Sequence, residues 1–284
     1  MKTNLNERRV NVCYCGNGMV FPLILLSVLS ITKYTSCDVT VYILTMDLSE
    51  KDKRFTPITA SQLHILKEAI TIKNVSNDVV LLDMREAYLR CLDRGKNSKN
   101  HYTPYAQGRL LLSEFELPER VLYIDSDVMC CSDLSQILEV DIENYEFAAV
   151  LDHMGKFWIK RDYCNSGVML LNMETVKRTN LLARARELVN TKRLVFPDQT
   201  ALNRLVKYKL VLPRKFNEQR AICEDTVLKH FCKGIKWLPF FKVYNYKQSD
   251  VKSVRNKLHI NQFDDVYGQY NLLARKYGFV TLDC

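Results

Sequence analysis

Two carboxylates stand one residue apart directly after an apolar run. Val121–Ile124 is fully apolar, and Asp125-Ser126-Asp127 follows it. Two acidic side chains this close repel each other unless a cation lies between them. Carboxylate oxygens, completed by a phosphate oxygen, are ligands that suit Mg²⁺ or Mn²⁺. The tripeptide therefore indicates a divalent metal site. The alternative for so short a motif is a surface turn in which Asp127 caps a helix.

The segments around this tripeptide alternate between strand-like and helix-like patterns, which predicts an α/β domain with a largely parallel central sheet. Fully apolar strands agree, because such a sheet is covered on both faces. Ligands bind at the carboxyl ends of the strands, where Asp125 stands. The expected strands are 10–15, 39–44, 79–82, 121–124, 147–151 and 167–171, and the expected helices are 22–34, 49–72 with a break near Pro57, and 104–115.

Composition limits the class of protein. Of the 284 residues, 47% are hydrophobic and 26% are charged, which excludes collagen-like and broadly disordered chains. Residues 1–150 hold 16 basic and 20 acidic residues, a net charge of −4, whereas residues 151–284 hold 25 and 12, a net charge of +13. The basic second half predicts an anionic partner: nucleotide phosphates, nucleic acid or an acidic membrane surface.

The ten cysteines form no CxxC pair, so the paired thiolates of a zinc ribbon are missing. The chain is longer than the usual disulfide-stapled domain, and we expect reduced thiols and a cytoplasmic location. No apolar run reaches the roughly 18 residues of a transmembrane helix. Arg8-Arg9 followed by the apolar residues 20–31 imitates a signal peptide, but the turn at 16–18 and Pro22 favour strand, turn and helix.

Six motifs, one of which contains the Asp pair, follow one another along the chain. They are Cys15-Gly16-Asn17-Gly18, Tyr105–Leu110, Arg120–Asp127, Tyr163–Asn172, Pro197–Asn203 and Lys229–Trp237. Together these six blocks, which cover roughly residues 10–240, resemble glycosyltransferase family 8. That resemblance implies a GT-A fold, a Rossmann-like fold of nucleotide-diphospho-sugar transferases. It also implies transfer of galactose or glucose from UDP-galactose or UDP-glucose with retention of anomeric configuration.

The resemblance assigns roles to particular residues. It implies that Asp125, Asp127 and His230 hold Mn²⁺ or Mg²⁺. It makes Gln199 and Asp198 the candidate catalytic residues, and leaves open whether Gln199 attacks the sugar or the acceptor enters on the face of the leaving group. The residues it implies at the nucleotide sugar are Tyr14, Asn17, Arg109, Asp125, Ser126, Asn165, Ser166, Gln199 and Lys236.

The last block departs from the family pattern. Lys233 stands where the family has glycine, with Gly234 one place later, and no proline follows Lys236. We therefore expect a differently built loop over the pyrophosphate, to which Lys236 and Lys233 would add positive charge.

Several candidates also have simple structural explanations. His230 follows an apolar strand and is a structural residue by default. Gly167 permits close backbone approach, Asp198 is placed to cap a helix, and Arg109 on a helix is by default a solvated charge.

The chain divides into a catalytic domain, residues 1–235, and a C-terminal extension, residues 236–284. We expect the extension to pack on the domain or to contact an anionic membrane, with the protein peripheral at the inner membrane face. Interleaved basic and aromatic residues can also stack nucleobases and neutralise phosphates, although we expect no nucleic acid partner. The interleaved basic and aromatic residues are Lys236, Trp237, Phe240, Phe241, Lys242, Tyr244, Tyr246, Lys247, Lys252, Arg255 and Lys257.

Three other functions compete with hexosyl transfer to a glycan, lipid-linked or protein acceptor. A sugar-phosphate nucleotidyltransferase usually has a basic, glycine-rich loop after its first strand, whereas here no basic residue follows Gly18 until Lys33. A nucleic-acid-binding or membrane-binding protein without catalysis would explain the charge alone. A transferase that has lost catalysis would not need the intact Asp125, Asp127 and His230.

Overall fold

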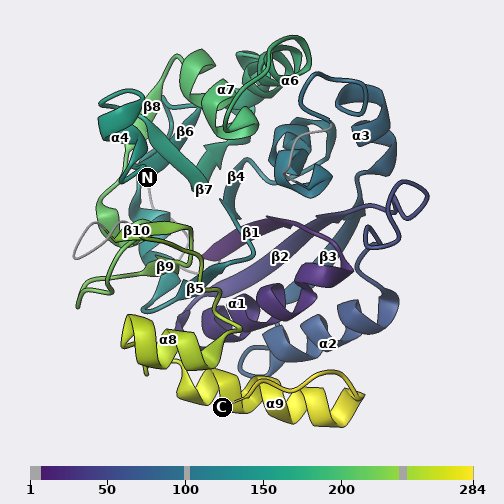
Figure 1. Cartoon of the computed structure of the whole chain (residues 1–284), viewed down its shortest axis with the longest axis vertical. Helices are drawn as coiled ribbons and strands as arrows, with labels where there is room; N and C mark the ends of the chain where they lie inside the picture. Colours follow the sequence, from purple (N-terminus) through teal and green to yellow (C-terminus); the bar gives the residue numbers. More distant parts are fainter. Residues whose placement is uncertain (1–7, 99–102, 237–241, 284) are drawn as a thin grey trace.

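A seven-stranded mixed sheet forms the centre of the computed structural model, which describes residues 8–98, 103–236 and 242–283 (Figure 1). The strand order is β3-β2-β1-β4-β7-β6-β8, and every pair is parallel except the two that β7 makes with β4 and β6. The predicted α/β class with a mainly parallel sheet is confirmed. The strands are β1 (Arg9–Cys15), β2 (Asp38–Thr45), β3 (Asp78–Asp83), β4 (Arg120–Ile124), β6 (Phe147–Leu151), β7 (Cys164–Asn172) and β8 (Lys209–Val211).

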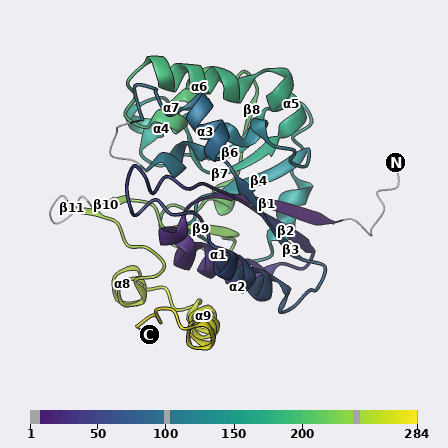
Figure 2. The ribbon, with the colours of Figure 1, turned by 90° about the vertical axis from the view of Figure 1, so that its right-hand side faces the viewer.

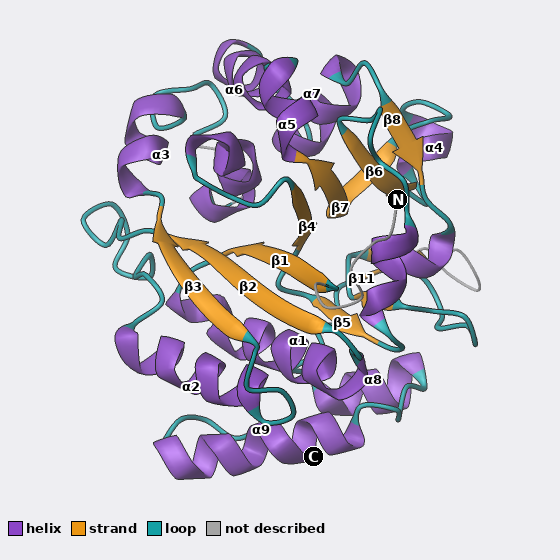
Figure 3. Cartoon of the chain, turned by 180° about the vertical axis from the view of Figure 1, so that it is seen from behind, coloured by secondary structure: helices purple, strands orange, loops and turns teal. Residues whose placement is uncertain are grey.

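Helices α1 (Phe21–Tyr34) and α2 (Ala60–Thr71) cover one face of the sheet, and α9 (Asp264–Tyr277) lies outside α1 (Figure 3). The apolar run that imitates a signal peptide is α1, which has Pro22 in its first turn. Side chains on nearly all sides of α1 are buried, because it packs between the sheet and α9.

Two expected helices differ from the prediction. Residues 49–59 form turns and extended chain, and α2 begins only after Thr59. Thr59 and Gln62 exchange side-chain and backbone hydrogen bonds in a capping box, which fixes this start. The segment expected as a helix over 104–115 is helical in the 3₁₀ form, η2 (Pro104–Glu114).

A second core lies on the opposite face of the sheet, where η2, α6 (Leu181–Thr191) and α7 (Pro197–Leu205) pack (Figure 1). Two short antiparallel pairs stand apart from the main sheet: β5 (Val128–Cys130) with β9 (Leu228–His230), and β10 (Gly234–Lys236) with β11 (Lys242–Tyr244). The remaining elements are α3 (Arg85–Cys91), α4 (Gly155–Trp158), α5 (Met173–Arg178), η1 (Gly18–Val20), η3 (Leu134–Glu139) and η4 (Arg214–Phe216).

In the helical part of the C-terminal extension, α9 packs beside α1 (Figure 2), and α8 (Val251–Leu258) is joined to α9 by an ion pair between Arg255 and Asp264. Phe279 makes edge contacts with the rings of Phe21 in α1 and Tyr270 in α9, at centroid distances of 5.6 and 5.5 Å. Val254 and Phe263 are completely buried in the same core. These helices thus share the core of the sheet domain, and a boundary at residue 235 remains an interpretation of the sequence.

The nine cysteines in the described part of the chain are all free thiols. Cys13, Cys130 and Cys164 are buried, and Cys223 is exposed. Among the described residues, no helix combines the length and the apolar character needed to cross a bilayer.

Candidate functional site

The Asp pair follows β4 and faces His230 from β9. β9 pairs antiparallel with β5, and this register puts His230 opposite Val128, next to Asp127. The His230 Nε2 atom lies 3.2 Å from Asp127 Oδ1 and 3.9 Å from Asp125 Oδ2. One ligand atom from each of the three residues lies within 4.8 Å of the others, a spacing that suits one cation. The three residues predicted as metal ligands are therefore brought together.

Gly167 makes this approach feasible. Its carbonyl accepts a hydrogen bond from the Asp125 amide at 2.8 Å. A Cβ atom at this position would lie 2.2 Å from His230 Cε1 and 2.8 Å from Asp125 Oδ2. The simple structural explanation for Gly167 is thus correct, and the space that it leaves is occupied by the candidate ligands.

His230 is oriented from its other ring nitrogen. Its Nδ1 atom lies 3.2 Å from Asn217 Oδ1. The Asn217 amide nitrogen donates to Asn165 Oδ1 at 3.0 Å, which leaves Asn217 Oδ1 as an acceptor. A proton on Nδ1 is donated to that acceptor, so Nε2 is the ring nitrogen that faces the carboxylates and, once unprotonated, is free to bind a metal.

Arg109 is a buried cation between two carboxylates. Its Nη2 donates to Asp125 Oδ1 at 2.7 Å, and its Nε lies 3.0 Å from Asp198 Oδ2. Its Nη1 donates to Ser166 Oγ at 2.8 Å, and the guanidinium stands 4.6 Å from the centre of the Tyr123 ring. Arg109 therefore orients side chains of the site, and the default of a solvated charge does not apply.

Asp198 is buried against Arg109. Burial raises the pKa of the Asp198 carboxyl above its ordinary value, although Arg109 acts in the opposite direction, and the negative charge of Asp125 raises the pKa further. Asp198 lies in the first turn of α7, after Pro197. The interpretation of Asp198 as the helix cap is wrong, because Phe196 holds the N-cap position and Asp198 lies inside the first turn, where it faces Arg109.

Gln199 is held in place by β6 and β7. Its Oε1 accepts a hydrogen bond from the Ser166 amide at 3.0 Å, and its Nε2 donates to Asp152 Oδ2 at 3.2 Å. The same Asp152 oxygen accepts from Asn165 Nδ2 at 2.9 Å. Asp152 follows β6 and carried no sequence motif, so sequence reasoning missed it, as it missed Asn217.

Lys247 also reaches the Asp pair. Its ammonium group forms an ion pair with Asp127 and donates to the Phe231 carbonyl at 3.2 Å. Burial opposes the charge on Asp127, but His230 and Lys247 hold the pKa of its carboxyl well below the usual range. The sequence grouped Lys247 only with the basic residues of the C-terminal extension, without a role at the site.

A cleft of about 450 Å³ opens beside the Asp pair, and we call it the donor cleft after the role that the sequence predicts for it; His230 is not among the residues that line it. Cys15, Phe55, Tyr105, Tyr123 and Phe196 add apolar and aromatic walls, which suit a nucleobase as well as a sugar. The residues predicted from the sequence that line it are Asn17, Arg109, Asp125, Ser126, Asp127, Ser166, Asp198 and Gln199.

Two of the residues expected at the nucleotide sugar lie away from the cleft. Tyr14 is completely buried, and its hydroxyl lies 2.8 Å from Ser27 Oγ of α1. Alternate strand residues point to opposite faces, so its neighbour Cys15 lines the cleft instead. Asn165 stands behind the wall, bonded to Asp152 and Asn217, and supports the site from there.

Lys236 ends β10, where its backbone pairs with Lys242 of β11. Its contact with the pyrophosphate stays a prediction. Trp237, Phe240 and Phe241 of the basic and aromatic stretch lie outside the described residues.

Another cleft, of about 570 Å³, lies beside Asn217, and we call it the second cleft. Asn217 lines it while also contacting His230, so only one layer of side chains separates it from the candidate metal ligands. Gln219 spans its floor, accepting from the His153 amide at 3.0 Å and donating to the Leu151 carbonyl at 3.0 Å. Arg214 and Arg220 also line it.

Residues 11–238 match the model of glycosyl transferase family 8, and the chain belongs to that family. It is 28% identical over 176 residues to glycosyltransferase GlyB of Streptococcus pneumoniae, covering 58% of this chain and 41% of GlyB. It is 29% identical over 162 residues to lipopolysaccharide 1,2-glucosyltransferase of Escherichia coli K12, covering 45% of this chain and 48% of that protein. The chain thus spans less than half the length of either relative.

Solved structures agree on the GT-A fold. The galactosyltransferase LgtC, solved with donor and acceptor sugar analogues, superposes with a TM-score of 0.58 at 14% identity over 78% of this chain and 87% of LgtC. Glycosyltransferase GlyE of Streptococcus pneumoniae TIGR4 superposes with a TM-score of 0.61 at 17% identity over 97% of this chain and 66% of GlyE.

Proposed function

We propose that this protein is a metal-dependent, retaining hexosyltransferase that moves galactose or glucose from a UDP-sugar to a glycan, lipid-linked or protein acceptor. One observation carries the proposal: Asp125, Asp127 and His230 converge within 4.8 Å at a cleft with polar and aromatic walls. Membership of glycosyl transferase family 8 supports it.

The donor set fits a divalent cation. Two carboxylates and one imidazole, whose Nδ1 is tied to Asn217, suit Mn²⁺, and Mg²⁺ is the alternative. Asp125, Asp127 and His230 would hold the ion, which when bound supplies Lewis-acid stabilisation of negative charge on a diphosphate leaving group.

The chain's own side chains would bind and orient the donor. Phe55 and Tyr105 make an edge contact at a centroid distance of 5.8 Å, which gives the cleft a firm aromatic wall for uracil. Asp198 and Gln199 would face the sugar, where positive charge develops on the ring during transfer. The bonds from Ser166 and Asp152 fix the Gln199 amide, so its carbonyl needs little reorganisation as that charge forms.

The second cleft would receive the acceptor. It lies across one layer of side chains from the candidate metal ligands, and its amide and guanidinium groups, on Gln219, Arg214 and Arg220, offer hydrogen bonds to sugar hydroxyls. Among the relatives, the lipopolysaccharide 1,2-glucosyltransferase of Escherichia coli K12 acts on a lipid-linked glycan by its name, which supports that acceptor class. We also propose a cytoplasmic location, peripheral at the inner membrane face, where such acceptors are reached.

Release of UDP tests the proposal without a known acceptor. The purified chain is incubated with UDP-galactose or UDP-glucose and Mn²⁺, and then with EDTA. Metal-dependent release from one sugar supports the proposal and identifies the donor. Absence of release together with pyrophosphate formation from UTP and a hexose 1-phosphate would replace it with nucleotidyl transfer.

A further inference from the structure

Three consecutive apolar side chains protrude at α4. Phe157, Trp158 and Ile159 are 76%, 72% and 49% exposed. Single exposed apolar residues are normal, whereas a contiguous group with two aromatic rings marks an interaction surface. Only four residues form α4, between β6 and β7, and Phe157 and Trp158 also line the second cleft.

Basic residues flank these three side chains on both sides. Lys156 precedes them, with its ammonium group 5.1 Å from the centre of the Phe157 ring, and Lys160 and Arg161 follow. Lys160 pairs with Asp162 at 3.1 Å, but Asp162 is shared with Lys209 at the same distance. In the described part of the chain, Lys156 and Arg161 have no ion-pair partner, so two positive charges are left for an outside ligand. We call residues 156–161 the α4 tip.

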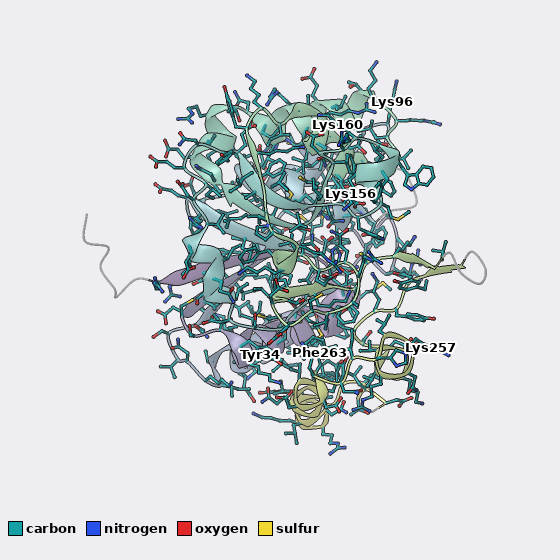
Figure 4. The ribbon with its side chains drawn as sticks, turned by 90° about the vertical axis from the view of Figure 1, so that its left-hand side faces the viewer. Tyr34, Lys96, Lys156, Lys160, Lys257 and Phe263 are labelled. Carbon is teal, nitrogen blue, oxygen red and sulfur yellow. The ribbon has the colours of Figure 1, made fainter. Side chains whose placement is uncertain are left out.

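The α4 tip lies on the side of the molecule toward which β1 and β2 run. Figure 2 shows α4 and the carboxyl ends of these strands on one side, and the start of β1 on the other. Figure 4 shows Lys156 and Lys160 on the same half as Lys96 and Lys257, opposite the start of β1. The Asp pair follows the carboxyl end of β4, so the positive charges gather on the side that carries the candidate site.

We propose that the α4 tip docks this protein on an anionic phospholipid bilayer. Phe157 and Trp158 would enter the interface between headgroups and acyl chains, where aromatic rings are favoured, while Lys156, Lys160 and Arg161 face lipid phosphates. The combination of protruding apolar rings with cations on both sides fits a bilayer better than a glycan, since a sugar stacks on a ring without needing flanking charge. This docking site differs from the C-terminal extension. Because Lys156, Phe157 and Trp158 also line the second cleft, docking would bring that cleft to the bilayer, and in this respect the inference rests on the proposed function.

Co-sedimentation with vesicles tests the docking. The full chain is mixed with vesicles of phosphatidylcholine and phosphatidylglycerol, or of phosphatidylcholine alone. We expect binding only to the anionic vesicles, and a loss of about tenfold or more at high salt, because screening weakens the contacts of exposed cations.

Two variants separate the apolar and the charged parts. The double variant Phe157→Ser/Trp158→Ser and the triple variant Lys156→Gln/Lys160→Gln/Arg161→Gln should each bind anionic vesicles about tenfold more weakly or worse. Val75→Ser is the matched control, because Val75 is 90% exposed but precedes β3 at the opposite edge of the sheet, and it should bind as wild type does. The serine variants should unfold at the wild-type temperature, since Phe157, Trp158 and Val75 are exposed. The triple variant should unfold close to it, since of its three residues only Lys156 is partly buried.

Tryptophan emission reports the contact directly. The chain has two tryptophans, so Trp237→Phe leaves Trp158 as the reporter. Its emission should shift to shorter wavelength with anionic vesicles. The proposal is overturned if the double variant binds vesicles as tightly as wild type, which would point to the C-terminal extension, or if wild type binds none. A Trp158 response to a soluble acidic oligosaccharide, with none to vesicles, would overturn it in favour of a glycan site.

Discussion

The donor cleft and the α4 tip lie on the same side of the protein but are built in opposite ways. In the donor cleft, side chains are held by other buried groups: Arg109 bridges two carboxylates, and Gln199 is bonded at both ends of its amide. At the α4 tip, Phe157 and Trp158 are mostly exposed.

The difference fits the roles that we propose for the two regions. Stabilising a charge that forms during a reaction requires groups that are already in position, because reorganisation costs rate. Docking on a fluid bilayer requires apolar area and charge, and tolerates several arrangements. Changes in the donor cleft should therefore alter donor chemistry while leaving vesicle binding intact.

The largest effect is expected at Asp127. Asp127→Asn keeps the shape of the side chain but removes its charge, so metal-dependent UDP release should fall by about 100-fold or more. Asp83→Asn changes another carboxylate at the end of a strand, on β3, and should retain wild-type release. Equal UDP release from the two variants would show that Asp127 matters no more for release than another carboxylate at the edge of the sheet.

A substitution at Gly167 tests whether the spacing of the three candidate metal ligands matters. Gly167→Ala puts a methyl group into the space occupied by His230 and Asp125, so UDP release should fall by about 10–100-fold as the ligands move apart. Gly268→Ala on α9 is the matched control, because a Cβ there meets nothing within 4 Å, and it should release UDP normally. Normal release from Gly167→Ala would show that the spacing of the three ligands is not critical.

Arg109→Lys sharpens the comparison by keeping the charge and removing the planar fork. Lysine cannot reach Asp125, Asp198 and Ser166 together, so we expect a roughly tenfold loss of UDP release and a lower unfolding temperature. Arg186→Lys, which affects a partly buried arginine bound to Glu114 and the Leu110 carbonyl, should lower stability without changing release. If Arg186→Lys lowered UDP release as much as Arg109→Lys does, the role of Arg109 would be structural only.

The smallest effect is expected at Lys247. Its ammonium group competes with a cation for Asp127, so Lys247→Met should raise the affinity for Mn²⁺ without nucleotide by a few-fold, up to about tenfold. Titration calorimetry measures this on the apoprotein. Lys252→Met, which removes an exposed pair with Asp283, serves as the control and should leave Mn²⁺ affinity unchanged. A fall in affinity in Lys247→Met would contradict the competition.

The parts of the site that could be predicted are those encoded locally. The apolar strand β4 and the two carboxylates that follow it are consecutive in the chain, so their position at the sheet edge was visible. His230 was predicted only through the family pattern, because its pairing with β5 joins distant segments. Asp152, Asn217 and Lys247 act through contacts between separate segments with no regular spacing, so no local signal was present.

The position of Tyr14, away from the donor cleft, has a physical cause. β1 lies inside the sheet and is covered on both faces, so its sequence lacks the alternation of apolar and polar residues that would identify the outward face. The helix predicted over 49–72 begins later in the structure, for a different reason. The helical spacing of apolar residues extends through 49–59, but the capping box at Thr59 sets the start of the helix.

Binding of UDP with and without Mn²⁺ tests the central claim most directly, because it requires neither turnover nor an acceptor. Titration calorimetry on the full wild-type chain should show UDP binding in Mn²⁺ that weakens by at least about tenfold in EDTA. Asp127→Asn should bind UDP in Mn²⁺ no better than wild type does in EDTA. Equal UDP affinity with and without the ion, or no binding in either condition, would contradict the assignment of the donor cleft as a metal-dependent nucleotide-sugar site.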